Sequence, residues 1–145
     1  MKIRRPILLS IAAAAAFLST AANAAQLTVM KSPYCGCCSK WIEHVEKHGF
    51  TVKVVETEDM TSVKKRLGVP DRLASCHTTM AGGYFIEGHV PAADIKRLLA
   101  QKPKATGIAV PGMPAGSPGM ETGRAEAYAT IIVRPDGTTS VFARH

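Results

Sequence analysis

The spacing of hydrophobic and polar positions along the chain predicts strands and amphipathic helices in alternation. Runs rich in valine, threonine and leucine at 27–30 and 51–55 have the composition of strands. Between them, Trp41 and Val45 fall on one face of a helix that Gly49 is placed to end. Two strands joined through a helix favour parallel pairing in one sheet.

The pattern continues with a helix, a hairpin and another helix. Apolar residues recur at helical spacing over 60–67, just before a glycine that can end the segment. We expect a strand at 83–86, a tight turn at 87–88 and a return strand beginning at 89–90. Pro91 then opens a helix, at a position where a missing N–H costs nothing.

Proline and glycine interrupt the pattern over 102–123, a segment that also holds Met113 and Met120. We expect a loop there, with neither helix nor central strand. A last hairpin is predicted over 126–143. The fold class is therefore α/β, a mixed sheet flanked by helices with an extra C-terminal β-hairpin. A C-x-x-C at the first strand-to-helix junction makes this arrangement resemble the thioredoxin fold.

The start of the chain has the three-part layout of a secretory signal peptide. Basic residues precede an apolar run at 7–18, and 22–24 reads Ala-Asn-Ala, a small-x-small cleavage site. The run is shorter than the roughly 20 residues that a membrane-spanning helix needs. We expect residues 1–24 to be cleaved, and 25–145 to be a single periplasmic domain with no membrane association.

Charge changes this picture little. The formal net charge is +7, and removal of Lys2, Arg4 and Arg5 with the leader lowers it to +4. The one basic run that remains, 64–66, falls on a predicted helix, where we expect a solvated surface. Neither aromatic interleaving nor a known motif supports binding of nucleic acid.

The four cysteines carry the candidate chemistry. They are Cys35, Cys37, Cys38 and Cys76, and export would put them in an oxidising compartment, where free thiols seldom persist without a function. Disulfides that stabilise a fold close long loops, whereas a Cys35–Cys38 bond closes almost none. Three cysteines at the start of a helix, where the dipole favours a thiolate, therefore indicate a chemical site.

Two chemistries fit these sulfurs. Cys35 and Cys38 have the spacing of a redox pair, which leaves Cys37 as a sulfur that a dithiol oxidoreductase does not need. A thioredoxin-like fold would bring Cys76 beside the cluster, although about forty residues separate it from Cys35. Three or four converging thiolates suit a soft metal ion, copper(I) first and zinc as its competitor.

Histidine and methionine add weaker candidates. His77 is a ligand, a partner of a ligand or an exposed loop residue, and we favour the last of these. We expect His44 and His48 to lie on a helix surface. Met113 and Met120 are either a thioether lid over the site or apolar cover under a long loop.

Several motifs together resemble the CopG family of periplasmic proteins associated with copper tolerance in bacteria. They are Tyr34-Cys35-Gly36-Cys37-Cys38, Ser75-Cys76-His77-Thr78, Gly82-Gly83-Tyr84, Ile86-Glu87-Gly88-His89-Val90-Pro91, Val110-Pro111-Gly112-Met113-Pro114 and Gly116-Ser117-Pro118-Gly119-Met120-Glu121. The resemblance implies a thioredoxin-like fold and a site for one or several copper ions, made by Cys35, Cys37, Cys38 and Cys76. We also expect copper ions and other copper-handling proteins of the periplasm as partners.

Three hypotheses follow, and Cys37 separates the first two. The chain is a periplasmic copper(I)-binding protein, with or without a redox step on the metal. Alternatively it is a thiol–disulfide oxidoreductase that uses the Cys35/Cys38 pair, or a module that is only held together by disulfides. Metal ligation explains Cys37, and dithiol exchange does not.

Overall fold

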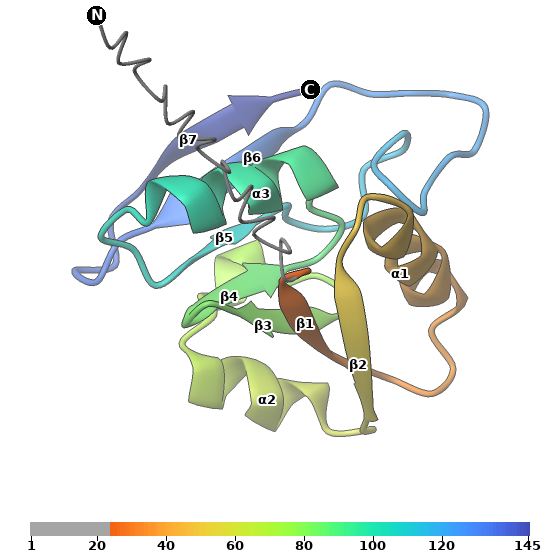
Figure 1. Ribbon diagram of the computed structural model, residues 1–145, viewed down its shortest axis with the longest axis horizontal. Coiled ribbons are helices and arrows are strands. Elements are labelled where there is room, and N and C mark those ends of the chain that lie inside the picture. Colours follow the sequence, from red (N-terminus) through yellow and green to blue (C-terminus); the bar gives the residue numbers. More distant parts are fainter. Residues whose placement is uncertain (1–23) are drawn as a thin grey trace, which may run out of the picture.

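A computed structural model describes residues 24–145 (Figure 1). The predicted signal peptide, up to residue 23, lies outside the described residues. In the described part of the chain, no helix combines the length and the apolar character that crossing a bilayer requires.

Residues 24–145 form one seven-stranded sheet with three α-helices. The strands are β1 (Gln26–Lys31), β2 (Thr51–Glu56), β3 (Thr78–Ala81), β4 (Tyr84–Glu87), β5 (Gly107–Ala109), β6 (Ala129–Val133) and β7 (Thr139–Arg144). The helices are α1 (Gly36–Lys47), α2 (Met60–Leu67) and α3 (Ala92–Gln101), with a 3-10 turn η1 at Asp71–Leu73.

The sheet is mixed, as the sequence predicts. Its strand order is β2-β1-β3-β4-β5-β6-β7, with parallel pairing in β1/β2 and β4/β5 and antiparallel pairing elsewhere. The C-terminal β6–β7 hairpin is present at the far edge of the sheet. The α/β class, the mixed sheet, its flanking helices and the hairpin are thus confirmed.

Two apolar cores cover the two faces of the sheet. On one face, Trp41 of α1 and Ile95 of α3 pack with Val29 of β1 and Ile86 of β4, all fully buried. On the other face, Phe85 packs with residues that follow α2 and with η1. Figure 1 shows α3 and α2 on opposite sides of the sheet. Alternate strand residues therefore serve alternate cores, which is the period-two pattern of a sheet buried on both faces.

The central hairpin lies one strand earlier than the sequence pattern predicts. The turn is at Gly82-Gly83, between β3 and β4, and not at 87–88, so the predicted return strand at 89–90 is wrong. Both glycines have positive φ, at 55° and 85°, and Ala81 pairs with Tyr84 across them. A two-residue turn with positive φ at both positions matches the twist of the flanking strands, which explains the choice of Gly-Gly.

The prediction that 102–123 holds no central strand is also wrong. β5 is a three-residue strand between β4 and β6, and all three of its residues are buried. Gly107 permits this position, because a Cβ there would lie 2.3 Å from the Phe85 carbonyl oxygen. Such a short strand, flanked closely by prolines, leaves almost no periodic signal in the sequence.

Candidate metal centre

The first half of the site is the junction between β1 and α1. The Cys35 amide donates to the Ser32 carbonyl oxygen at 3.1 Å, which turns the chain out of the strand. Cys35 caps the helix in an extended conformation, and Cys37 and Cys38 follow in its first turn. Their sulfurs thus lie at the helix end where the unpaired N–H groups and the dipole favour negative charge.

The second half of the site is the segment before β3, which carries Cys76. The Ser75 amide donates to the Glu87 carboxylate at 2.7 Å, and the Ser75 hydroxyl donates to the Gly112 carbonyl oxygen. A Cβ at Gly88 would lie 2.5 Å from the Ser75 hydroxyl, so only glycine allows this close approach. The buried carboxylate and the glycine together fix the backbone next to Cys76.

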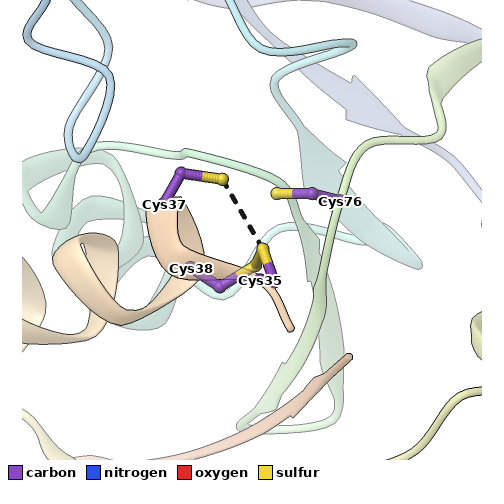
Figure 2. Close-up of side chains that lie close together, drawn as sticks. All are labelled: Cys35, Cys37, Cys38 and Cys76. Atoms are coloured by element: carbon purple, nitrogen blue, oxygen red, sulfur yellow. Dashed lines mark hydrogen bonds between the residues drawn. A yellow bond between two sulfur atoms is a disulfide. The ribbon is translucent and has the colours of Figure 1, made fainter. Parts of the chain in front are cut away.

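The fold brings all four sulfurs together. The sulfur atoms of Cys35, Cys37, Cys38 and Cys76 all lie within 4.8 Å of one another, and in Figure 2 Cys76 reaches toward the helix start from the opposite side. Two thiolates that share a metal ion are separated by at most about 4.6 Å, twice a zinc–sulfur bond. The four-residue set predicted from sequence is therefore compact enough to hold metal after small movements.

The cysteines differ in covalent state and exposure. Cys35 and Cys38 form a disulfide, while Cys37 and Cys76 are free thiols. Cys38 is fully buried, whereas Cys37 is partly exposed at the rim of the group. The Cys37 sulfur lies 3.5 Å from the Cys35 sulfur and 3.9 Å from the Met113 sulfur.

A loop from the proline- and glycine-rich segment closes over α1. A Cβ at Gly119 would lie 2.9 Å from both the Cys37 carbonyl oxygen and the Trp41 amide nitrogen, so the loop reaches this depth only with glycine. Met113 is half exposed near Cys37. The hydrogen bonds of Met120 within residues 24–145 are made by its backbone. Of the two methionines, the structure thus brings Met113 to a cysteine sulfur.

Two buried histidines flank Cys76. Its sulfur lies 3.2 Å from His77 Nδ1 and 3.0 Å from His89 Nε2. His89 Nδ1 donates to the Pro118 carbonyl oxygen at 2.7 Å, so the lone pair of the neutral ring is on Nε2, toward the sulfur. His77 packs against Trp41 with ring centroids 4.5 Å apart. The expectation that His77 is an exposed loop residue is wrong, because the ring is fully buried.

Burial determines the protonation states of Cys76, His77 and His89. It raises the pKa of the Cys76 thiol to about 12, and the charge of Cys37 adds to the effect. Burial also lowers the pKa of His77 well below its usual range and lowers the pKa of His89. In the metal-free protein near neutral pH, Cys76 is a protonated thiol beside two neutral imidazoles, and a metal ion that binds its sulfur must displace a proton.

His89 is the residue that the sequence pattern misses. A misassigned return strand put it in the sheet, whereas it lies in the connection from β4 to α3. The other histidines lie apart from the sulfurs: His44 Nε2 accepts a hydrogen bond from the Ala92 amide at 3.1 Å, and His48 is exposed. Had the turn been predicted at Gly82-Gly83, His89 would have been placed just after the end of the following strand, a position where functional side chains commonly lie.

Comparison with known proteins identifies the family to which this chain belongs. Residues 73–120 match the family model described as "Protein of unknown function, DUF411". Among curated proteins, none matches the chain. A solved structure titled "Copper resistance protein copG- Form 2" is 47% identical, with a TM-score of 0.81, over 84% of this chain and 98% of that chain. The chain belongs to the CopG family of copper resistance proteins.

A second CopG structure, titled as Form 1, is 48% identical over 83% of this chain and 96% of that chain, with a TM-score of 0.79. The likeness extends along nearly all of both CopG chains and confirms the resemblance seen in the sequence. Membership together with the cysteine cluster indicates copper handling as the general role of this CopG-family chain.

Proposed function

We propose that the chain binds copper(I) through the thiolates of Cys35, Cys37, Cys38 and Cys76. The observation that carries this proposal is the convergence of four sulfurs within 4.8 Å from two segments far apart in the chain. Thiolate ligands select copper(I) among the common metal ions, and four of them can bridge more than one ion. Zinc is the competitor, because it also accepts a tetrahedral set of four cysteines.

The disulfide makes metal loading depend on redox state. Cys35 and Cys38 can act as thiolates only after their bond has taken up two electrons, and the free thiols are then Cys35, Cys37, Cys38 and Cys76. In the oxidised protein only Cys37 and Cys76 remain as thiol ligands. We therefore expect reduction to create the copper(I) site and oxidation to remove half of its ligands.

A thiol–disulfide oxidoreductase is the second candidate function. The Cys35–Cys38 disulfide at a helix start favours it, since that is the position of an exchangeable redox pair. Reduction of this bond by an external thiol would pass two electrons and two protons to the pair and release an oxidised partner. Cys37 has no necessary part in that exchange.

Cys37→Ser separates the two candidates. A copper site loses a soft ligand, so we expect the reduced variant to bind copper(I) about 10-fold more weakly or to hold fewer ions. A Cys35–Cys38 oxidoreductase should keep most of its exchange rate with a small dithiol. Both quantities are measured on the same preparation. Unchanged copper(I) binding with collapsed exchange would reverse the ranking of the two functions.

Met113 is proposed as a lid that slows copper release, and Met120 provides the matched control. Met113→Leu keeps volume and apolarity but removes the thioether that lies 3.9 Å from the Cys37 sulfur. We expect transfer of copper(I) to a chelator to become a few-fold faster, and Met120→Leu to leave the rate near that of the wild type. Stopped-flow absorbance measures both rates. Equal rates in Met113→Leu and the wild type would reduce Met113 to loop packing.

We propose a periplasmic location for this activity, with copper-handling proteins of that compartment as partners. The leader at 1–24 and the cysteine-rich site support this, and the working unit would be the single domain 25–145 with a thioredoxin-like fold. The N-terminal residue of protein recovered from a periplasmic extract tests the cleavage. Ala25 is the expected first residue, and an intact leader in the membrane fraction would overturn the proposal.

A further inference from the structure

The two histidines beside Cys76 are unused by a four-sulfur site, yet they are arranged as ligands. We propose that Cys76, His77 and His89 form a second, mixed sulfur–nitrogen site for a divalent first-row cation, available while Cys35 and Cys38 are joined by a disulfide. The site shares Cys76 with the proposed copper(I) centre and needs none of the other three sulfurs.

The geometry fits a single ion. A cation with a sulfur at about 2.3 Å and a nitrogen at about 2.1 Å separates these two atoms by roughly 3.1 to 3.6 Å, for bond angles from square to tetrahedral. The observed distance from the Cys76 sulfur to His77 Nδ1 is 3.2 Å, which lies inside this range. The distance to His89 Nε2 is 3.0 Å, about 0.1 Å below the range, so a bound ion requires only a small outward shift of that ring. All three donor atoms lie within 4.8 Å of one another.

The surroundings of His89 match those of a metal-bound imidazole. Its Nδ1 donates to the Pro118 carbonyl oxygen at 2.7 Å, which fixes the tautomer and turns the Nε2 lone pair toward Cys76. Histidine ligands in metalloproteins commonly donate their second nitrogen to a carbonyl in this way. Gly119 supports the contact, since the loop that carries Pro118 reaches His89 only because residue 119 lacks a Cβ.

His77 is costly as a structural residue alone. The ring is fully buried, and its Nε2 has no hydrogen-bond partner within residues 24–145. A buried polar atom without a partner destabilises the fold relative to an apolar group of the same shape. Coordination through Nδ1 would explain why an imidazole, rather than an aromatic hydrocarbon, packs against Trp41 at this place.

The ligand set selects a different class of metal from the thiolate cluster. One sulfur and two imidazole nitrogens suit borderline divalent ions such as zinc and copper(II), with a fourth position open to Cys37 or water. Binding replaces the Cys76 thiol proton by the cation and releases that proton, with no change of oxidation state. The protein would then hold copper(I) when reduced and a divalent ion when the Cys35–Cys38 bond is formed.

Cobalt(II) is the probe, because it is redox-inert here and reports sulfur ligation by absorbance. The protein is the full mature chain with Cys37→Ser and an intact Cys35–Cys38 disulfide. Mass spectrometry after alkylation verifies the disulfide, because only the Cys76 thiol should then be modified. We expect one equivalent of cobalt(II) to bind with a sulfur-to-metal charge-transfer band, and zinc to displace it. The band should vanish in Cys76→Ser and require at least about 10-fold more cobalt in His89→Gln. His48→Gln is the matched control and should behave as its parent.

Absence of the band, or equal cobalt affinity in His89→Gln and its parent, would overturn the second site. If a buried-histidine variant fails to fold, ¹⁵N spectra of the Cys37→Ser protein decide without it. Zinc should shift His77 Nδ1 and His89 Nε2, and unmoved resonances would contradict the assignment. Copper(I) binding by the reduced wild type is measured separately, so that failure of one site does not imply failure of the other.

Discussion

Reduced Cys76→Ser protein is expected to lose copper(I) affinity by about 100-fold relative to the reduced wild type. Cys76 is the one cysteine of the cluster that comes from outside the Cys35–Cys38 segment, and Figure 2 shows it facing the other three. Serine has nearly the same shape, but its hydroxyl is a hard donor with little affinity for copper(I). The change therefore removes a ligand and leaves the packing largely intact.

Cys37→Ser provides the comparison for this loss. Cys37 lies partly exposed at the rim of the same group, so its substitution should weaken binding less than that of Cys76. Copper(I) affinities of both variants are measured by competition with a chromophoric chelator, with circular dichroism to verify folding. Wild-type affinity in Cys76→Ser would show that the helix-start cysteines suffice and that the four-sulfur site is wrong.

Glu87→Gln is expected to lower the free energy of unfolding by about 3 kcal/mol. Glu87 is fully buried and accepts hydrogen bonds from Lys64, from the Ser75 amide at 2.7 Å and from Thr78 at 2.6 Å. The Lys64 side chain retains only 14% exposure, so neutralising its partner leaves a poorly solvated ammonium group. The substitution keeps the size of the side chain and thus isolates the charge.

The same substitution at an exposed position is the control. Glu46→Gln on α1 should change stability by no more than about 0.5 kcal/mol. Urea denaturation of metal-free protein measures both changes. Because Glu87 also holds the backbone beside Cys76, copper(I) affinity should fall in Glu87→Gln while it stays unchanged in Glu46→Gln. Equal stability of the two variants would mean that Lys64 finds solvent or another partner.

Local sequence patterns predicted the elements that have strong periodicity or distinctive turns. Trp41 and Val45 define the buried face of α1, and Gly68 ends α2 in the left-handed conformation expected of a helix-ending glycine. The cysteine cluster could be predicted as well, because adjacent cysteines close no useful loop. Its completion by Cys76 was expected from the resemblance to a thioredoxin-like arrangement. In the structure, β3 follows Cys76 directly and pairs with β1, which brings Cys76 to the junction of β1 and α1.

The errors come from interactions that act over long distances. Gly82-Gly83 and Gly88 both have positive φ, and sequence alone did not decide which of them turns the hairpin. Gly88 is required by its approach to Ser75, not by a reversal of the chain. That error hid His89, whose contacts with Cys76 and Pro118 join three segments separated along the chain.

The most direct test is a copper(I) competition titration of the wild-type domain in two redox states. Fully reduced protein should hold copper(I) against an equimolar chelator, with only sulfur neighbours in its X-ray absorption spectrum. Protein that carries the Cys35–Cys38 disulfide should lose most of that affinity, because two of its four sulfurs are no longer thiolates. Equal copper(I) affinity in the two states, or a clear preference of the reduced protein for zinc, would contradict a copper(I) centre built from Cys35, Cys37, Cys38 and Cys76.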